Sequence, residues 1–184
     1  ARRLNNKKLG LIGFGNISRH LAKLVKQFNM DIMTYDPFIS KETAQDEDVE
    51  LVELDVLIKH SDYISIHCPL NKNTYHLLSN DRFNMMKSTA FVINTSRGSI
   101  IDTTALVQAL LKGKIAGAGL DVHEEEPINI EHPLCKINNV ILTPHAGFYT
   151  YESFIRLRTS MMEQTIAIIE SKKPAHIFNP EVLS

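Results

Sequence analysis

The sequence contains no tryptophan and only two cysteines among its 184 residues. Cys68 and Cys135 stand alone, without the paired spacing of zinc or redox motifs. We therefore expect neither a disulfide framework nor a bound metal. Low cysteine content of this kind is typical of a reducing compartment, and the cytoplasm is the default expectation.

An excess of charge of one sign is also missing. The chain carries 20 basic and 21 acidic residues, for a net charge of −1. Because Lys and Arg do not cluster, nucleic acid is not expected as a partner. No apolar run is long enough to span a bilayer and none has the pattern of a signal peptide, so we expect no membrane segment.

The composition that remains is that of a globular protein. Hydrophobic residues make up 43% of the chain, and 184 residues suffice for one domain with its own core. The first residue is Ala1 rather than methionine. We expect the chain to be a piece of a longer protein.

The most informative stretch runs from Leu9 to Asp36. A short apolar run is followed at once by Gly13-Phe-Gly15, and apolar residues then recur at helical spacing from Asn16 to Phe28. The apolar residues at this spacing are Ile17, Leu21, Leu24, Val25 and Phe28. A second apolar run, Ile32 to Tyr35, ends at Asp36, so the order is strand, tight turn, helix and strand.

That order suits a dinucleotide. Glycines let the backbone approach a pyrophosphate, and the positive end of the following helix attracts its charge. Asp36 lies where a carboxylate can accept hydrogen bonds from the adenosine ribose, and no arginine follows it to bind a phosphate there. We therefore expect NAD rather than NADP. The third glycine of the motif is replaced by Ser18, and a glycine turn in an unrelated α/β protein remains the alternative.

Strands and helices alternate along the rest of the chain. Further strands are expected at 49–51, 62–66, 90–93, 115–120 and 140–142, and helices at 53–60, 79–86, 102–112 and 150–171. We expect Ser79 and Asp102 to cap their helices, Gly113 to end one, and Gly117 and Gly119 to allow close backbone approach. The fold class is α/β: a Rossmann-type, doubly wound parallel sheet in three layers, α/β/α.

Polar residues follow every expected strand. In a parallel sheet, ligands bind outside the carboxyl ends of the strands. The residues at those ends are Gly13–Gly15, Asp36, His67–Pro69, Asn94–Gly98, Asp121 and Thr143–His145. This repeated pattern is more specific than the glycine turn alone.

Three of these loops carry charged or titratable candidates. Arg97, next to Gly98, could grip a carboxylate through two parallel hydrogen bonds, although a surface arginine pairing with a helix end fits equally well. His145 lies between a proline and a glycine, but it is one of 8 histidines. The run Glu124-Glu125-Glu126 before Pro127 could equally be a solvated charge run.

The sequence resembles the D-isomer-specific 2-hydroxyacid dehydrogenases, including phosphoglycerate dehydrogenase-like members. The matching segments occur in family order: GFGNIS (13–18), YDP (35–37), HCPLNKNT (67–74), NTSRGSIID (94–102), GAGLDVHEEEP (117–127) and NVILTPHAG (139–147). The variant LDVHEEEP, with HAGFYTYES after the histidine, is similar to the C-terminal-binding-protein branch, which includes an NAD-sensing corepressor.

This resemblance implies an NAD-dependent oxidoreductase that moves a hydride between NAD(H) and a small 2-hydroxy or 2-oxo acid. Arg97 matches the arginine that orients the substrate carboxylate, His145 the proton donor and Glu126 its acidic partner. The chemistry agrees, because a carboxylate near a histidine favours the imidazolium form and keeps a proton available near neutral pH.

The resemblance also implies a set of cofactor contacts. Gly13, Gly15, Asn16 and Ile17 would face the pyrophosphate, and Asp36 the ribose. The other implied contacts are Cys68, Pro69 and Thr74 on the adenosine and phosphate side, and Thr95, Ser96 and Asp121 on the nicotinamide side, with Gly147 as a further contact. Cys68 is expected to be a packed residue rather than a nucleophile.

Departures from the family temper these expectations. Ser18 replaces a glycine and Asn16 a frequent arginine, so altered cofactor affinity is expected. Residues 1–184 match only an NAD-binding domain, whose tail, from about residue 174, would return toward a substrate domain absent from this chain. We therefore expect cofactor binding, poor turnover in isolation and a homodimer. The identity of the acid stays open, and an NAD-sensing, protein-binding module of the corepressor type is the alternative.

Overall fold

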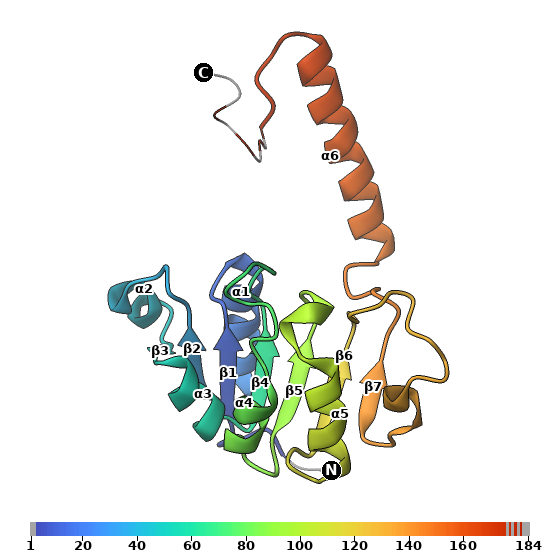
Figure 1. The fold of residues 1–184 in the computed structure, drawn as a ribbon. Coiled ribbons are helices and arrows are strands. Elements are labelled where there is room, and N and C mark those ends of the chain that lie inside the picture. The colour runs from blue at the N-terminus through green and yellow to red at the C-terminus, as the bar shows by residue number, and fades with distance from the viewer. Residues whose placement is uncertain (1–2, 176, 178, 180, 182–184) are drawn as a thin grey trace. The chain divides into compact units, whose positions relative to one another are not determined.

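The structure, a computed structural model, describes residues 3–175, 177, 179 and 181. It divides into two compact units, Ala1–His145 and Ala146–Ser184, which are described separately. The first unit is built on one seven-stranded sheet with helices on its faces (Figure 1).

Every adjacent pair of strands in the sheet is parallel. The strand order is β3-β2-β1-β4-β5-β6-β7, which contains the doubly wound Rossmann order and confirms the predicted fold class. The strands are β1 (Lys8–Ile12), β2 (Asp31–Tyr35), β3 (Glu50–Leu51), β4 (Tyr63–Ile66), β5 (Phe91–Asn94), β6 (Gly117–Leu120) and β7 (Val140–Leu142).

The helices connect these strands in the predicted order. They are α1 (Asn16–Val25), α2 (Lys41–Asp46), α3 (Leu54–His60), α4 (Asn80–Met85) and α5 (Thr103–Leu111). Three short 3₁₀ turns are η1 (Lys26–Phe28), η2 (Gly98–Ile100) and η3 (Pro133–Lys136). The last of these lies in the segment between β6 and β7.

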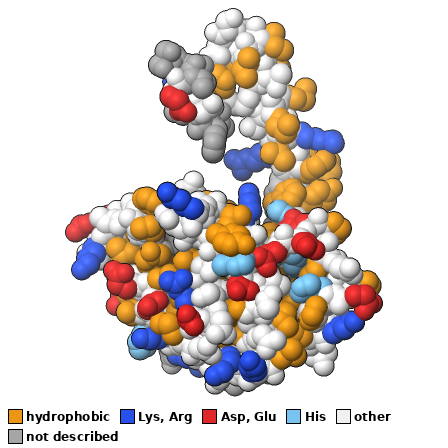
Figure 2. Space-filling model, viewed as in Figure 1, with side chains coloured by type: hydrophobic (Ala, Val, Ile, Leu, Met, Phe, Trp, Pro, Cys, Tyr) orange, Lys and Arg blue, Asp and Glu red, His pale blue; other side chains and the backbone are white. Residues whose placement is uncertain are grey.

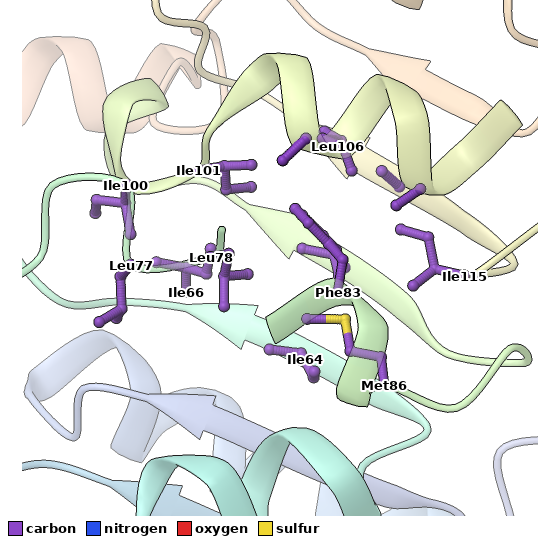
Figure 3. Close-up of a cluster of buried hydrophobic side chains, with 14 of the residues drawn as sticks. Ile64, Ile66, Leu77, Leu78, Phe83, Met86, Ile100, Ile101, Leu106 and Ile115 are labelled. Atoms are coloured by element: carbon purple, nitrogen blue, oxygen red, sulfur yellow. The ribbon is translucent and has the colours of Figure 1, made fainter. Parts of the chain in front are cut away.

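Two hydrophobic cores lie on opposite faces of the sheet. The larger core packs α3, α4 and α5 against β4, β5 and β6. Figure 3 shows the part of it formed by side chains of β4, α4, α5 and the segments next to them. Its fully buried side chains include Ile64, Ile66, Leu78, Phe83 and Leu106. The smaller core packs α1 against β1 and β2, so helices lie on both faces and the three-layer prediction is confirmed.

Helix α1 does not bury the apolar stripe that its sequence indicates. Ile17, Leu24 and Phe28 are at least half exposed, and only Leu21 and Val25 of the apolar residues at helical spacing pack against the core. The residues that α1 buries completely are Ser18 and Ala22. Small side chains at these two positions let the helix lie close to the sheet, which a stripe of large side chains would prevent.

The face that carries the smaller core is only partly covered within the first unit. Tyr63, Phe91, Ile93 and Ile141 line a shallow open hollow over β4 to β7. Ile141 is 71% exposed. The described residues of this unit leave that part of the face open.

Of the two predicted N-terminal helix caps, the one at Asp102 forms and the one at Ser79 does not. The side chain of Asp102 accepts a hydrogen bond from the Ala105 N–H at the start of α5, and Gly113 follows that helix with φ +65°. Ser79 occupies the N-cap position of α4, but its side chain makes no capping bond.

Of the two strand glycines in β6, only Gly117 allows a close approach. A Cβ there would lie 2.5 Å from the Asn139 carbonyl oxygen. A Cβ at Gly119 would have nothing within 4 Å. The expectation was therefore right for Gly117 and wrong for Gly119.

The second unit contains helix α6 (Tyr151–Ile169), close to the predicted range. Thr150 caps it by accepting a hydrogen bond from the Ser153 N–H at 3.0 Å. None of the residues described in α6 is buried within the structure. No helix in the described part of the chain is both long and apolar enough to cross a bilayer. The prediction for the tail falls largely on residues outside the described ones.

A glycine-to-alanine pair tests how tightly the sheet packs on α3. A Cβ at Gly10 would collide with the Ser61 hydroxyl and lie 2.5 Å from Leu57 Cδ2, so Gly10→Ala overpacks the core. We expect this substitution to lower the free energy of unfolding by about 1–3 kcal/mol in urea titrations.

Gly119→Ala is the matched control, because it adds the same methyl group to a strand with open space around it. It should change the free energy of unfolding by less than about 0.5 kcal/mol. Equal effects of the two substitutions would contradict the packing described for β1 and α3.

Candidate functional site

The loops that follow the strands gather polar side chains at one edge of the sheet. Figure 2 shows acidic and histidine side chains close together where β5 and β6 end. Glu124 contacts His76 there, and Glu126 contacts His145. These contacts join segments that lie far apart in the sequence.

The turn between β1 and α1 is made of backbone packed against backbone. Gly13 has φ +91°, and a Cβ on it would lie 2.7 Å from the Cys68 backbone nitrogen. Glycine is therefore required at position 13 by the fold itself. Gly15 differs, because a Cβ there would meet nothing within 4 Å and its φ of −82° suits any residue.

Asp36 joins the glycine turn to the end of β2. Its Oδ2 accepts a hydrogen bond from the Phe14 N–H at 2.8 Å, and its Oδ1 accepts one from the Phe38 N–H at 2.8 Å. Each carboxylate oxygen has a second lone pair and can accept one more hydrogen bond. Asp36 can therefore hold the turn and also bind a hydroxyl group.

A cavity of about 230 Å³ lies beside this turn. It is bounded by the ends of β1, β2 and β4 and by the loop after β4. The residues that line it are Ile12, Gly13, Phe14, Gly15, Tyr35, Asp36, Pro37, Phe38, His67, Cys68, Pro69, Asn71, Asn73, Thr74 and Leu77. Six predicted cofactor residues are among them: Gly13, Gly15, Asp36, Cys68, Pro69 and Thr74.

Two titratable groups in the cavity wall are affected by burial. Burial raises the pKa of the Cys68 thiol to about 11, so the thiol is protonated near neutral pH and is a poor nucleophile. Burial also lowers the pKa of His67, whose Nε2 lies 2.9 Å from the Ser65 hydroxyl. Both groups are therefore uncharged walls of the cavity at neutral pH.

The loop after β4 is held by its own side chains. The Thr74 hydroxyl donates to the Pro69 carbonyl at 2.6 Å and accepts from the Asn71 N–H at 2.8 Å. The Ser96 hydroxyl donates to the Cys68 carbonyl at 2.6 Å, which ties the end of β5 to this loop.

The remaining predicted cofactor residues lie outside the lining of this cavity. Asn16 and Ile17 are exposed at the first turn of α1, and Thr95 is exposed after β5. Asp121 is buried at the end of β6, where its side chain bonds to the Thr143 hydroxyl. Gly147 belongs to the second unit.

Arg97 lies on an exposed loop that is hydrogen-bonded to the last residue of β5. The buried Asn94 side chain donates to the Arg97 carbonyl at 2.9 Å, and the Arg97 Nη1 donates to the Ser96 carbonyl at 2.6 Å. A Cβ at Gly98 would overlap the backbone carbonyl group of His123. The loop of Arg97 therefore packs directly on the segment that carries Glu126.

Glu126 and His145 form a direct pair. The His145 Nδ1 and the Glu126 Oε2 are 2.7 Å apart, and the other carboxylate oxygen accepts the His123 N–H at 3.0 Å. The hydrogen bonds from His145 and His123 hold the pKa of Glu126 below its usual value. Since an ionised carboxylate only accepts, Nδ1 carries a hydrogen, and Nε2 is the atom that could pass a proton.

Glu124 is exposed, but its carboxylate binds two other segments of the chain. Its Oε1 lies 2.6 Å from His76 Nε2, and its Oε2 accepts the Thr103 N–H at 3.1 Å. Burial tends to raise the pKa of Glu124, but the hydrogen bonds from Thr103 and His76 outweigh it and lower that pKa. Neither Glu124 nor His76 was predicted as a site residue. The only sequence signal was the position of Glu124 just after a strand end.

These features fit a dinucleotide. The empty space around Gly15 leaves its backbone open to a phosphate group, and the N-terminus of α1 follows directly. Asp36 has lone pairs left for ribose hydroxyls. The fold and the cavity together define a dinucleotide-binding domain of the Rossmann class.

Comparison with known proteins identifies the family. Residues 1–147 match the family described as D-isomer specific 2-hydroxyacid dehydrogenase, NAD binding domain, and the chain belongs to this family. It is 42% identical over 181 residues to a glyoxylate reductase of Thermococcus litoralis, covering 98% of this chain and 54% of that protein. It is 39% identical over 163 residues to a D-3-phosphoglycerate dehydrogenase of Archaeoglobus fulgidus, covering 89% of this chain and 31% of that protein.

Solved structures agree with the sequence comparison. The D-lactate dehydrogenase of Lactobacillus jensenii, crystallised with NAD+, superposes with a TM-score of 0.87 at 30% identity, covering 96% of this chain and 57% of that one. The chain thus spans about half the length of the relatives it matches. The predicted family and cofactor class are confirmed.

The Glu124 bridge predicts a pH-dependent contribution to stability. Because the folded-state pKa of Glu124 is lowered, its contribution is present above the unfolded pKa of about 4.3 and is lost as pH falls through the folded pKa. We expect Glu124→Gln to lower the free energy of unfolding by about 0.5 kcal/mol at pH 7. In urea titrations this difference should shrink as the pH approaches 3.

Glu125→Gln is the control, since Glu125 is the exposed neighbour and makes no hydrogen bond to a described residue. It should have little effect at either pH. A Glu124→Gln effect that is the same at both pH values would argue against an ionised bridge.

Proposed function

We propose that this chain is the cofactor-binding half of an oxidoreductase that transfers a hydride between NAD(H) and a small 2-hydroxy or 2-oxo acid. The observation that carries the proposal is the Glu126–His145 pair, which lies on the same sheet edge as the glycine-lined cavity. A cofactor cavity alone fits many reactions, whereas this pair fits proton transfer to a carbonyl oxygen.

In this proposal the glycine turn and the start of α1 hold the cofactor's pyrophosphate, with Gly13, Gly15, Asn16 and Ile17 around it. Asp36 binds the adenosine ribose and disfavours a phosphate there, so NAD is preferred to NADP. The further contacts proposed are Cys68 and Pro69 on the adenosine side, Thr74 near the phosphates, and Thr95, Ser96 and Asp121 on the nicotinamide side. Gly147 is also proposed as a cofactor contact.

The reaction requires a hydride at carbon and a proton at oxygen. Bound NADH would supply the hydride. His145 would deliver the proton through Nε2, because Nδ1 is engaged by Glu126 at 2.7 Å. Glu126 stabilises the protonated ring and fixes its orientation. Arg97 would bind the substrate carboxylate with two parallel hydrogen bonds.

The substrate class follows from the relatives. Glyoxylate, lactate and phosphoglycerate are all small 2-hydroxy or 2-oxo acids, or esters of them, and the names of similar proteins mention each. We propose that a separate substrate domain selects among such acids, and that residues 1–184 form the NAD-binding domain whose tail returns toward it. A homodimer and a cytoplasmic location remain predictions.

A second function has one observation in its favour. The segment after His145 exposes the aromatic rings of Phe148, Tyr149 and Tyr151. An NAD-sensing module of the corepressor type could use such rings to bind a protein. A partner protein whose affinity is the same with and without NADH would exclude that reading.

Cofactor titration of this chain tests whether it binds NADH and prefers it to NADPH. We expect saturable enhancement of NADH fluorescence, and binding of NADPH at least about tenfold weaker because of the Asp36 charge. Background is low because the sequence has no tryptophan. Gly15→Ala should weaken NADH binding at least about tenfold while the free energy of unfolding stays within about 0.5 kcal/mol.

Gly119→Ala again serves as control, since it also adds a methyl group to open space. If both alanine variants bind NADH like the wild type, the glycine turn does not contact the cofactor. If neither the wild type nor any variant binds NADH or NADPH, the proposed cofactor role is wrong for this chain.

Arg97 is tested in the full-length protein. Arg97→Lys keeps the charge but removes the two-pronged geometry. Since a hydrogen bond to a charged group contributes about 1.5–3 kcal/mol, we expect kcat/KM for a 2-oxo acid to fall about 10- to 100-fold with the NADH affinity unchanged. Arg156→Lys, an exposed arginine on α6, is the control. Unchanged turnover in Arg97→Lys would remove Arg97 from the site.

A further inference from the structure

His123 lies between the acid/base pair and the end of β6. Its backbone N–H donates to Glu126 Oε1 at 3.0 Å. Its ring Nε2 lies 3.1 Å from the carbonyl oxygen of Thr143, two residues before His145. A single residue therefore contacts both the segment of Glu126 and the turn of His145.

The tautomer of His123 follows from its partner. A carbonyl oxygen can only accept, so Nε2 carries the hydrogen in this contact. The ring Nδ1 is buried and has no hydrogen-bond partner among the described residues. The ring therefore acts on the site through Nε2 alone.

The turn that carries His145 depends on a few such contacts. The Thr143 N–H donates to the Leu120 carbonyl at 3.0 Å, and the His145 N–H donates to the Asp121 carbonyl at 2.8 Å. The Thr143 hydroxyl bonds to the Asp121 carboxylate. These three bonds attach the turn to the end of β6. None of them involves the Thr143 carbonyl, which the His123 ring binds.

His145 itself has a strained backbone, with φ +53°. A non-glycine residue in this region persists only where its surroundings hold it. The bond from the His123 ring fixes the peptide between Thr143 and Pro144, one peptide before the strained residue. This contact is therefore well placed to set where the His145 ring lies.

We propose that His123 is a positioning residue for the acid/base pair: its ring Nε2–H holds the Thr143 carbonyl and so keeps His145 within hydrogen-bond distance of Glu126. The proposal rests on the proposed function for the meaning of that pair. It differs from the role of Glu126, because His123 does not contact the reacting atoms and acts only through the turn.

Two substitutions separate the ring donor from the rest of the residue. His123→Phe keeps a ring of similar volume but removes the donor, and His123→Gln places an amide N–H near the position of Nε2. Both keep the backbone N–H that binds Glu126. His132→Phe is the control, because His132 lines the same cavity as His123, of about 230 Å³ beside α5, and caps η3.

The readout is the pKa of the Glu126 carboxyl group, measured by ¹³C NMR on the 184-residue chain. In the wild type this pKa should be below its usual value, mainly because of the His145 hydrogen bond. We expect His123→Phe to lose most of that depression, and His123→Gln and His132→Phe to retain it. The thermal unfolding midpoint should be similar in all folded variants, which a merely structural role would not predict.

An unchanged Glu126 pKa in folded His123→Phe overturns the proposal, as does an equal shift in His132→Phe. Should His123→Phe fail to fold, ¹⁵N NMR of the wild-type imidazoles decides, since dominance of the Nδ1–H tautomer of His123 would also overturn it. These measurements need neither NADH nor substrate. Failure of the NADH titration would therefore refute the proposed function without affecting this test, and the reverse also holds.

Discussion

Parallel strand pairing is the constraint on which the rest of this structure depends. Because all seven strands run the same way, every connection leaves the carboxyl end of one strand and enters the amino end of the next, at the opposite end of the sheet. The carboxyl ends of β1, β2 and β4 therefore surround one cavity. The ends of β5, β6 and β7 carry Arg97, Glu126 and His145. Segments as far apart in the sequence as those of Gly13 and His145 therefore lie at the same end of the sheet.

Three carboxylates hold the loops at the carboxyl ends of the strands in place. Asp36, Glu124 and Glu126 each use their two oxygens to bind two different segments. A carboxylate can do this because it accepts several hydrogen bonds at once. Loops rich in polar groups are thereby held in one conformation, which the proposed proton transfer would require. Two of these carboxylates also have lowered pKa values, so they are ionised under ordinary conditions.

Much of this could be predicted from the sequence, and the failures have a common cause. Strand positions, the sheet class and the polar strand ends follow from short-range patterns, and the family segments locate Glu126 and His145. The apolar spacing in α1 indicates a helix but not how closely that helix lies to the sheet; the small buried residues Ser18 and Ala22 decide that distance. Glu124, His76 and His123 were missed because their partners are set by tertiary contacts between loops. No spacing rule encodes such contacts.

The contact of Gly13 with the Cys68 backbone has a consequence for how such a domain can diverge. At this contact the wall of the proposed cofactor cavity is main chain, so it presents the same atoms whatever side chains surround it. The rim includes side chains such as that of Phe38, which is 91% exposed. Substitutions that accumulate at the rim can retune the affinity for one nucleotide over another while the main-chain wall keeps its shape. In the proposed function, recognition of phosphate by the main chain would thus stay fixed while recognition by side chains can be adjusted, and evolution can act on the second without risking the first.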